Sequence, residues 1–459
     1  ALTGLFTAMA AGTEARAGLT LARVLVTSVA LLLPACLMGA TFPAIINGAA
    51  LDSPTRRSAR TGYLYSINTI GAALGCLAAG YYMLSELGVQ VTLNVALGAY
   101  IMAAGCALLA NLLKTDAPPS TETRSPDDAG MTIAADVRTS RRFLYIATLL
   151  VGFVSLAYEV LLTRVSILYL GNTVSVFPLV LTAFLLGTGI SAIAGTWLYG
   201  RLQRDGTGAP DWLYGAAAAA AGLLLVATPY LLLTDAVIGP GHFAKFADAA
   251  PKSPVPILGI LLFPVVFLGA LLPLAIRMLA PAGRGAATRE AATLYALNTV
   301  GGLAGAGLIN HHVVPAIGMQ KAIALLSLLL LVITAANWAG TARRRLVPGA
   351  GVALATALVT AFLLPDMTAM YANKLAASTQ AEQVDIKLLH EGKAATVTVL
   401  DQFDPRLQDY RDMYLNGVEE ASTRFWHVQL FKLLGILPTL IHESDGPKEA
   451  LVIAFGAGI

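Results

Sequence analysis

Two ionisable side chains, Glu159 and Arg164, interrupt an apolar run that reads Gly152-Phe-Val-Ser-Leu-Ala-Tyr-Glu159-Val-Leu-Leu-Thr-Arg164. Such a run is typical of a membrane-spanning helix, in which a charged group is costly and commonly belongs to a binding site or an ion pathway. Five residues at about 100° each place the two side chains roughly 140° apart around the helix axis, so we expect no direct ion pair. Each should instead contact another helix or the membrane interface. Glu159 is equally consistent with a structural anchor and a site residue, and Arg164 is also long enough to reach towards the membrane surface.

Two asparagines, Asn68 and Asn298, occupy matching positions in two other apolar segments. Each follows a tyrosine by three residues and precedes glycines three and seven residues further on. An amide in hydrocarbon needs a hydrogen-bond partner, and small residues let a neighbouring helix approach closely. We therefore expect both amides to bond between helices, with a place in the lining of a substrate path as the alternative.

The three cysteines and the adjacent histidines have no spacing that predicts a metal or redox site. Cys36, Cys76 and Cys106 all fall in apolar segments, where cysteine packs as a small apolar residue. His311 and His312 point in different directions if they lie on a helix, so we expect an interface position for them and no bound metal.

The elements that position these residues must be membrane helices, because the composition leaves too little material for a water-exposed surface. Of 459 residues, 56% are hydrophobic and only 12% are charged, with a mean hydropathy of +0.70. Soluble domains carry roughly 25% charged residues. The net charge of +3 is too small to indicate a nucleic-acid partner. The partner that the composition predicts is the lipid bilayer.

Ten apolar segments are long enough to cross roughly 30 Å of hydrocarbon. Residues 1–9 resemble the end of a further span and not a signal peptide. The predicted spans are 23–47, 62–84, 90–113, 143–169, 173–199, 211–233, 255–280, 290–312, 320–340 and 348–365.

The two halves of this helical region repeat each other at an offset of 230 residues. Tyr65-Ser-Ile-Asn-Thr-Ile-Gly71 matches Tyr295-Ala-Leu-Asn-Thr-Val-Gly301, and Gly88 and Gln90 match Gly318 and Gln320. Matching Asn, Gly and Gln residues in one register indicate a duplication. The sequence thus predicts parallel six-helix repeats like those of major-facilitator transporters. The first copy would be N-terminally incomplete, so we expect the chain to begin inside a longer protein. The predicted domains are a first repeat at 1–113, a cytoplasmic linker at 114–142 and a second repeat at 143–341.

Basic residues predict the orientation in the membrane, because cytoplasmic loops carry excess Lys and Arg. The alternate loops near 85–89, 170–174 and 313–319 contain neither residue type, and the 234–254 loop carries two lysines. We therefore expect the arginine-bearing loops to be cytoplasmic. These arginines are Arg56, Arg57, Arg60, Arg138, Arg141, Arg142, Arg201, Arg204, Arg284, Arg289 and Arg343–Arg345.

A polar tail follows an extra transmembrane or interfacial helix at 342–365. Alternation with period two predicts strands at 384–392, 395–400 and 413–417 of a small antiparallel β-domain, 366–422. A helix at 424–441 and a buried strand at 451–459 would then open a Rossmann-like domain, 423–459. That strand runs into Gly456-Ala-Gly458, a turn in which glycines let the backbone approach a nucleotide.

The order of motifs in the tail resembles the spermidine synthase (aminopropyltransferase) family. The order is Glu391-Gly-x-x-Ala-Thr-Val-x-Val, then Leu415-Asn-Gly417, then a helix ending in Leu437-Pro438, then the glycine turn. The membrane part is similar to multi-spanning segments fused to such domains in bacteria. That similarity lies in Met38-Gly-Ala-Thr-Phe-Pro43, Leu64-Tyr-Ser-Ile-Asn-Thr69 and Glu159-Val-Leu-Leu-Thr-Arg164.

The resemblance implies a bacterial inner-membrane protein that transfers an aminopropyl group from decarboxylated S-adenosylmethionine to a diamine. Gly456 and Gly458 match the nucleoside-binding loop, and Glu420 stands where the family has a nucleoside-binding glutamine. The helix that follows lacks the family's Tyr-x-Glu or His-x-Glu, with Lys432 nearby instead. The acidic catalytic residues would lie beyond Ile459, so the resemblance implies no catalytic residue within this chain.

Two functions therefore remain open from the sequence. The first is a membrane-anchored aminopropyltransferase-like protein. The second is a transporter-like or complex-forming membrane protein with a degenerate, structural synthase-like domain. A polyamine ligand and assembly into a homodimer or a larger membrane complex are the partners that these readings suggest. If the 348–365 segment spans the membrane, the tail lies outside the cytoplasm, where nucleoside cofactors are scarce, and this favours the second function.

Overall fold

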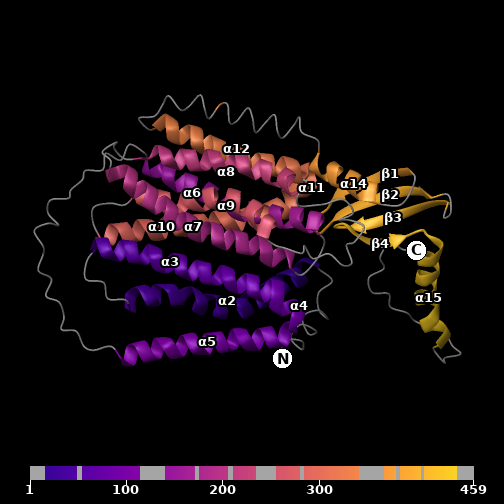
Figure 1. Ribbon diagram of the computed structural model, residues 1–459, viewed down its shortest axis with the longest axis horizontal. Coiled ribbons are helices and arrows are strands. Elements are labelled where there is room, and N and C mark those ends of the chain that lie inside the picture. The colour runs from indigo at the N-terminus through magenta and orange to yellow at the C-terminus, as the bar shows by residue number, and fades with distance from the viewer. Residues whose placement is uncertain are drawn as a thin grey trace, which may run out of the picture. The chain divides into compact units, whose positions relative to one another are not determined.

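A computed structural model describes most of the chain, and its elements are shown in Figure 1. The chain forms two compact units, Ala1–Tyr65 and Ser66–Ile459. The described residues are 16–48, 54–113, 140–170, 175–204, 210–233, 255–279, 284–340, 351, 366–378, 383–404 and 408–441.

The first unit contains helix α2 (Arg16–Gly48) and the beginning of α3 (Pro54–Leu77). The apolar segment Leu25–Thr41 lies in the middle of α2. This helix covers the predicted span at 23–47. Its large side chains Leu31, Leu33 and Leu37 are all exposed, as expected for a helix surface that meets lipid.

Eight helical segments of the second unit are long and apolar enough to cross a membrane, counted over the described residues. They coincide with eight of the ten predicted spans, so a polytopic helical fold is confirmed. Of the tenth predicted span, 348–365, only residue 351 is described. Two of the eight segments contain a π-helical turn and a short helix besides the long helix. The elements are α3 with η1 (Ala78–Met83) and α4 (Leu84–Glu86), α5 (Gly88–Leu112), α6 (Arg141–Leu170), α7 (Val176–Arg204), α8 (Trp212–Leu232), α9 (Val255–Leu279), α10 (Arg284–Leu308) with η4 (Ile309–Val313) and α11 (Val314–Ile317), and α12 (Met319–Gly340).

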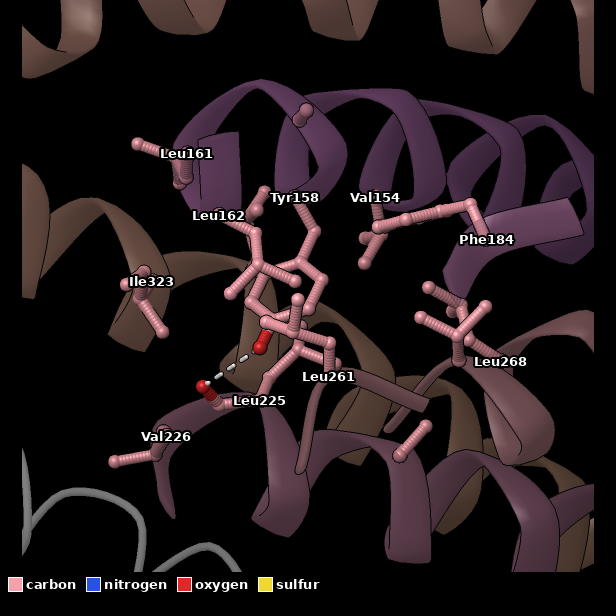
Figure 2. Packing of buried hydrophobic residues seen from close by; sticks show 14 of the residues in the cluster. Val154, Tyr158, Leu161, Leu162, Phe184, Leu225, Val226, Leu261, Leu268 and Ile323 are labelled. Atoms are coloured by element: carbon pink, nitrogen blue, oxygen red, sulfur yellow. Dashed lines mark hydrogen bonds between the residues drawn. The ribbon is translucent and has the colours of Figure 1, made fainter. Parts of the chain in front are cut away.

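The core of the second unit lies among α6, α7, α8, α9 and α12. Figure 2 shows Tyr158 of α6 among Leu162, Leu225 and Leu261, with its hydroxyl donating to the Leu225 carbonyl at 3.4 Å. Tyr158 is fully buried. Because lipid is as apolar as these side chains, dense packing and satisfied polar groups hold such helices together.

Helices α6 and α10 approach each other closely through glycines. A Cβ at Gly301 would lie 2.0 Å from the Leu149 carbonyl oxygen, and one at Gly305 would lie 2.2 Å from that of Phe153. Gly152 of α6 faces the backbone of α10 in the same way. Any side chain at these positions would force the two backbones apart.

A polar contact joins the same two helices near their beginnings. Arg141 of α6 forms an ion pair with Glu290 of α10, and the Tyr145 hydroxyl donates to the same carboxylate. Glu290 is buried. The sequence analysis did not single out this pair.

Helices α8 and α12 are joined by hydrogen bonds from α12 side chains to the α8 backbone. Ser327 donates to the Gly222 carbonyl at 2.6 Å, and Thr334 donates to the Gly215 carbonyl at 3.1 Å. The Asn337 amide oxygen accepts from the Gly215 N–H at 3.1 Å. Polar side chains are therefore placed where small residues leave the neighbouring backbone within reach.

The same series of local elements occurs in both halves of the sequence. A π-helical turn, a short helix and a glycine with positive φ lead into the next long helix, at η1–α4–Gly88–α5 and at η4–α11–Gly318–α12. The φ angles are 76° at Gly88 and 83° at Gly318, which favour glycine because it has no Cβ. The parallel six-helix repeat itself remains a prediction.

The tail forms a four-stranded antiparallel sheet in the order β1-β2-β3-β4, which confirms the predicted sheet. Its strands are β1 (Gln383–Glu391), β2 (Thr396–Asp404), β3 (Gln408–Leu415) and β4 (Val418–Ser422). The strand predicted at 413–417 is confirmed for 413–415, which end β3, but its last two residues are not strand: Asn416 and Gly417 form the turn between β3 and β4 with φ of 49° and 85°. Two residues with positive φ give the hairpin turn that matches strand twist.

Two helices flank the sheet. Helix α14 (Met367–Ser378) was not predicted, and the Asp366 side chain caps it by accepting from the Thr368 and Ala369 N–H groups at 2.9 Å. Helix α15 (Phe425–Ile441) lies at the predicted position and exposes large apolar side chains such as Trp426. The strand predicted at 451–459, and with it the Rossmann-like domain, lies outside the described residues.

Candidate functional site

The sheet and α14 are attached to the ends of the long helices by oppositely charged side chains. Lys374 of α14 donates to the carbonyl of Leu233, which follows α8, at 2.7 Å. Glu391, at the end of β1, accepts from the Met319 N–H at the start of α12 and from the Thr368 hydroxyl. A cation thus sits at a helix C-terminus and an anion at a helix N-terminus, each matching the helix dipole. Backbone groups that the helices leave unpaired at these ends find partners.

Gly318 is required where Glu391 meets α12. A Cβ at Gly318 would lie 3.1 Å from a Glu391 carboxylate oxygen, and its φ of 83° is strained for other residues. At the matching Gly88 no atom lies within 4 Å of the position of a Cβ. The glycine has the same backbone role in both places, but only Gly318 faces the sheet.

Arg164 connects α6 both to the neighbouring helix and to the sheet. Its guanidinium donates to the Asn310 amide oxygen at 2.8 Å and to the Gly392 carbonyl oxygen at 2.5 Å. Asn310 lies in the π-helical turn η4, a feature that re-aims side chains and is frequent at functional sites. The sequence correctly predicted that Arg164 meets another helix, but it singled out neither Asn310 nor the β1–β2 turn.

Glu159 and Arg164 line one pocket of about 350 Å³. The sequence predicts no direct ion pair between them, and both residues line the same pocket. Two side chains that start 140° apart around a helix can border the same wide face, and the long Arg164 side chain reaches back towards that face. The wall consists of Leu156, Glu159, Val160, Thr163 and Arg164 of α6, Phe177 of α7, Ala306 of α10, Asn310 of η4, and Lys393 and Ala394 of the β1–β2 turn.

The pocket lies towards the end of the helices that carries the sheet. Glu159 is half-buried, about eleven residues or roughly 17 Å of helix before the end of α6 at Leu170. Within the described residues its carboxylate has no hydrogen-bond or ion-pair partner. Lys393 is exposed at the pocket wall and has no such partner there either.

The arginine-bearing ends of the same helices lie opposite this pocket. Each of three helices has one pocket residue near one end and an arginine near the other: Arg164 and Arg141 on α6, Phe177 and Arg201 on α7, and Asn310 and Arg289 on the segment from α10 to η4. The sheet therefore attaches to the end of these helices opposite Arg141, Arg201 and Arg289.

The two asparagines are not brought into this pocket. Asn68 is exposed, and Asn298 meets Gly152 of α6 through its backbone oxygen, which a Cβ on Gly152 would approach to 2.0 Å. Neither amide has a hydrogen-bond partner in the described part of the chain. The contact between helices at Asn298 is made by glycine and backbone, and the predicted amide bond is not seen there.

The residues assigned through the family resemblance lie apart from the pocket or outside the described ranges. Glu420 is exposed on β4, Lys432 is exposed on α15, and Gly456 and Gly458 fall among residues that are not described. No nucleoside site can therefore be assembled from the described residues.

A charged network at the start of α15 was missed by the sequence analysis. Arg424 donates to Asp412 at 2.8 Å and to Glu419 at 2.6 Å, and His427 lies 3.4 Å from the Glu419 carboxylate. Burial alone would lower the pKa of Arg424, but the two carboxylates outweigh it and raise that pKa. The network holds β3, β4 and the first turn of α15 together.

The remaining candidate ligands do not gather. His311 and His312 are exposed, and the His311 ring nitrogen lies 3.2 Å from the Gly307 carbonyl. Cys36 and Cys106 are exposed, while the Cys76 thiol approaches the Pro178 carbonyl at 3.5 Å. Across the described ranges no group of three or more His, Cys, Asp or Glu side chains is arranged to hold a metal ion.

Comparison of the chain with protein-family models, with characterised proteins and with solved structures gives no match. Its fold and pocket define a class: a helical membrane protein that carries an attached antiparallel sheet. Its function has to be inferred from the geometry of that pocket.

Proposed function

We propose that this chain is a solute-binding membrane protein of transporter-like organisation, in which the pocket around Glu159 and Arg164 is the binding site. The observation that carries the proposal is the Glu159 carboxylate, which faces the pocket and has no partner among the described residues. An ionisable group at membrane depth without a structural partner is a functional candidate, because its desolvation has to be offset by a ligand, a proton or water.

The attached sheet acts in this proposal as a non-catalytic cap. Its β1–β2 turn supplies Lys393 and Ala394 to the pocket wall, and the Gly392 carbonyl fixes Arg164. A transporter needs a wall that can be closed and opened, and in the described part of the chain hydrogen bonds from Arg164 to Gly392 and from Met319 to Glu391 tie the turn to α6 and α12. The Glu391-Gly392 motif thus has a structural use here that does not involve a nucleoside.

The position of the sheet supports this reading. The sheet attaches opposite the arginine-bearing ends, and the positive-inside rule assigns those ends to the cytoplasm. The Met367 N–H donates to Gln320 at the start of α12 at 2.9 Å, whereas Gly340 ends that helix. Met367 and the sheet that follows it therefore lie at the end of α12 opposite Gly340. The sheet would then face away from the cytoplasm and its nucleoside cofactors.

Uptake into proteoliposomes tests the transport function. The purified full chain is reconstituted into vesicles, and one labelled solute at a time is added outside them. The three solutes represent three charge classes: spermidine is a cation, leucine a zwitterion and 4-methylpentanoate an anion. We expect uptake of at least one class, reduced tenfold or more in Glu159→Gln, because removing a charge from a charged hydrogen bond costs roughly 1.5–3 kcal/mol. The matched control is Glu86→Gln, an exposed acid in α4 away from the pocket. Absence of uptake for every class in the wild type would contradict the proposal.

Aminopropyl transfer is the second candidate, favoured by the order of four antiparallel strands followed by α15. Decarboxylated S-adenosylmethionine would be its co-substrate, with Gly456, Gly458 and Glu420 as the nucleoside-binding residues. Its test is transfer of a labelled aminopropyl group to putrescine by the purified protein. Turnover that is lost in Gly456→Val would establish the enzyme. Because the resemblance places the catalytic acids beyond Ile459, the assay uses the protein as it occurs in the cell, and no turnover by that protein would remove this candidate.

The side of the sheet is tested by labelling single cysteines in whole cells. In a variant without Cys36, Cys76 and Cys106, a cysteine at Lys387 on β1 should react with a membrane-impermeant maleimide, and one at Arg201 at the end of α7 should not. The reverse pattern would place the sheet in the cytoplasm and favour the enzyme.

A further inference from the structure

We infer that the pocket binds a zwitterion, a small molecule with an ammonium group, a carboxylate and an apolar side chain, as in an apolar amino acid. The inference rests on the proposed solute-binding function and names the class of solute. It follows from which charges in the pocket are already balanced and which are not.

The positive charge of Arg164 is largely balanced by groups of the protein itself. Two of its N–H groups donate to Asn310 and to the Gly392 carbonyl. The nearby Glu391 carboxylate offsets its positive charge, and that carboxylate is itself held by the Met319 N–H and the Thr368 hydroxyl. Arg164 is therefore a positioning residue that fixes the β1–β2 turn at the rim of the pocket.

Of the three charged residues in the pocket wall, Glu159 and Lys393 have no hydrogen-bond or ion-pair partner in the described part of the chain. Both line the pocket, one from α6 and the other from the β1–β2 turn. A carboxylate and an ammonium on opposite elements match a ligand that carries both charges in the reverse arrangement. The half-buried Glu159 would take the ligand's ammonium, and the exposed Lys393 would take its carboxylate.

Apart from Thr163 and Asn310, the rest of the wall is apolar and suits a hydrocarbon side chain. Leu156 and Val160 lie on the same face of α6 as Glu159, and Phe177 comes from the first turn of α7. A volume of about 350 Å³ lies at the small end of ligand pockets, which run from about 300 to 1,000 Å³. A polyamine fits this pocket less well, because its two or more cations would meet one carboxylate and two basic side chains.

Equilibrium binding to the purified full chain tests the inference with four probes that differ in charge alone or in class. These are labelled L-leucine, 3-methylbutylamine, which lacks the carboxylate, 4-methylpentanoate, which lacks the amine, and spermidine. We expect leucine to bind at least tenfold more tightly than each of the other three. This corresponds to about 1.4 kcal/mol for each ionic contact that is lost.

Two variants then assign the contacts. Glu159→Gln should weaken leucine tenfold or more and leave 4-methylpentanoate unchanged, and Lys393→Gln should weaken leucine and leave 3-methylbutylamine unchanged. Lys387→Gln, on β1 outside the pocket, is the control and should bind leucine like the wild type. Unchanged leucine affinity in both pocket variants would overturn the inference.

The outcomes separate the inference from the proposed function. If spermidine or 3-methylbutylamine binds more tightly than leucine, the zwitterion is wrong while solute binding stands. The same conclusion follows if no probe binds but the uptake assay finds a solute whose transport depends on Glu159. If no probe binds and no solute is taken up, both are overturned.

Discussion

The two halves of the membrane region contain matching glycines in very different surroundings. In α10, Gly301 and Gly305 lie against the backbone of α6, whereas Gly71 and Gly75 at the same repeat positions in α3 have no atom within 4 Å of a would-be Cβ. The matching register is visible in the sequence. The neighbour that uses it is present among the described residues only in the second half.

The last helix of each half differs in the opposite way. Helix α12 has Ser327, Thr334 and Asn337 bonded to the α8 backbone. Helix α5 has Leu97, Ala104 and Ala107 at those positions, and all three are exposed. An apolar face meets lipid without cost, whereas a polar face needs a partner. The comparison teaches that matching glycines occur in both halves whether or not a neighbouring helix is seen beside them, whereas the polar anchors occur in the half where a partner backbone lies within reach.

The largest difference in stability between matched variants of the two halves is expected at Gly301 and its counterpart Gly71. In Gly301→Ala the new methyl would lie 2.0 Å from the Leu149 carbonyl oxygen, so α6 and α10 must separate. We expect a loss of about 3 kcal/mol in the free energy of unfolding, measured by SDS titration in mixed micelles. Gly71→Ala should change it by less than about 0.5 kcal/mol. Equal losses in the two variants would show that α3 also has a close neighbour.

Substitutions at Gly88 and Gly318, the two glycines with positive φ, should differ less in their effect on the free energy of unfolding. Gly88→Ala and Gly318→Ala both place a Cβ on a residue with positive φ, at a cost of about 1 kcal/mol or more. Only at Gly318 does the methyl also crowd the Glu391 carboxylate, at 3.1 Å, so we expect a total of about 2 kcal/mol there. The same SDS titration measures both. A Glu391→Ala background should remove the difference, and a difference that persists would mean that Glu391 does not cause it.

The polar anchors of α12 predict a smaller effect. Asn337→Ala removes an acceptor for the Gly215 N–H, and hydrogen bonds between membrane helices contribute about 0.6–1.7 kcal/mol. Its counterpart Ala107→Val, on an exposed face of α5, should leave the unfolding free energy unchanged within a few tenths of a kcal/mol. A marked loss in Ala107→Val would reveal a partner for α5.

The smallest effect is expected in the sheet, which belongs to neither half. The hydrogen bond from Arg411 holds the pKa of Asp401 below its ordinary value. Because the folded-state pKa is the lower one, the stabilisation is present above the unfolded pKa of about 4 and is lost as the pH falls below it. Thermal melts at pH 7 and pH 3 should show a slightly smaller fall in Tm for Asp401→Asn than for the wild type. An identical fall would mean that the exposed pair contributes nothing.

Eight helices and the sheet were predictable from short-range patterns. Inside a bilayer the backbone N–H and C=O groups have no water to bond with, so an apolar segment must form a helix that pairs them internally. The length of an apolar segment is therefore enough to predict a membrane helix. The errors arose where short-range patterns overlap. Asn416-Gly417 was read as strand although this pair is the strongest signal for a two-residue turn. Helix α14 was missed because its twelve residues carry little periodic contrast.

The candidate site was predictable only in part. Glu159 and Arg164 stood out because charges are rare in apolar segments. Asn310 and Lys393 carried no signal of their own, since a polar residue near a span end or in a strand turn is ordinary. The pattern around Asn298 was misleading, because the neighbouring glycines allow a close contact between helix backbones and do not bring a partner to the Asn298 amide.

The sequence by itself determined that this chain has apolar helices long enough to cross a bilayer, roughly where eight of them lie, and that a sheet follows, because these features depend on hydrophobicity and spacing along the chain. Only the tertiary structure decided which polar groups meet. Arg164 reaches Gly392 over 228 residues, and Glu391 reaches Met319 over 72. Such contacts depend on how helix ends and turns pack in space, so the pocket emerged only once the β1–β2 turn was seen beside α6.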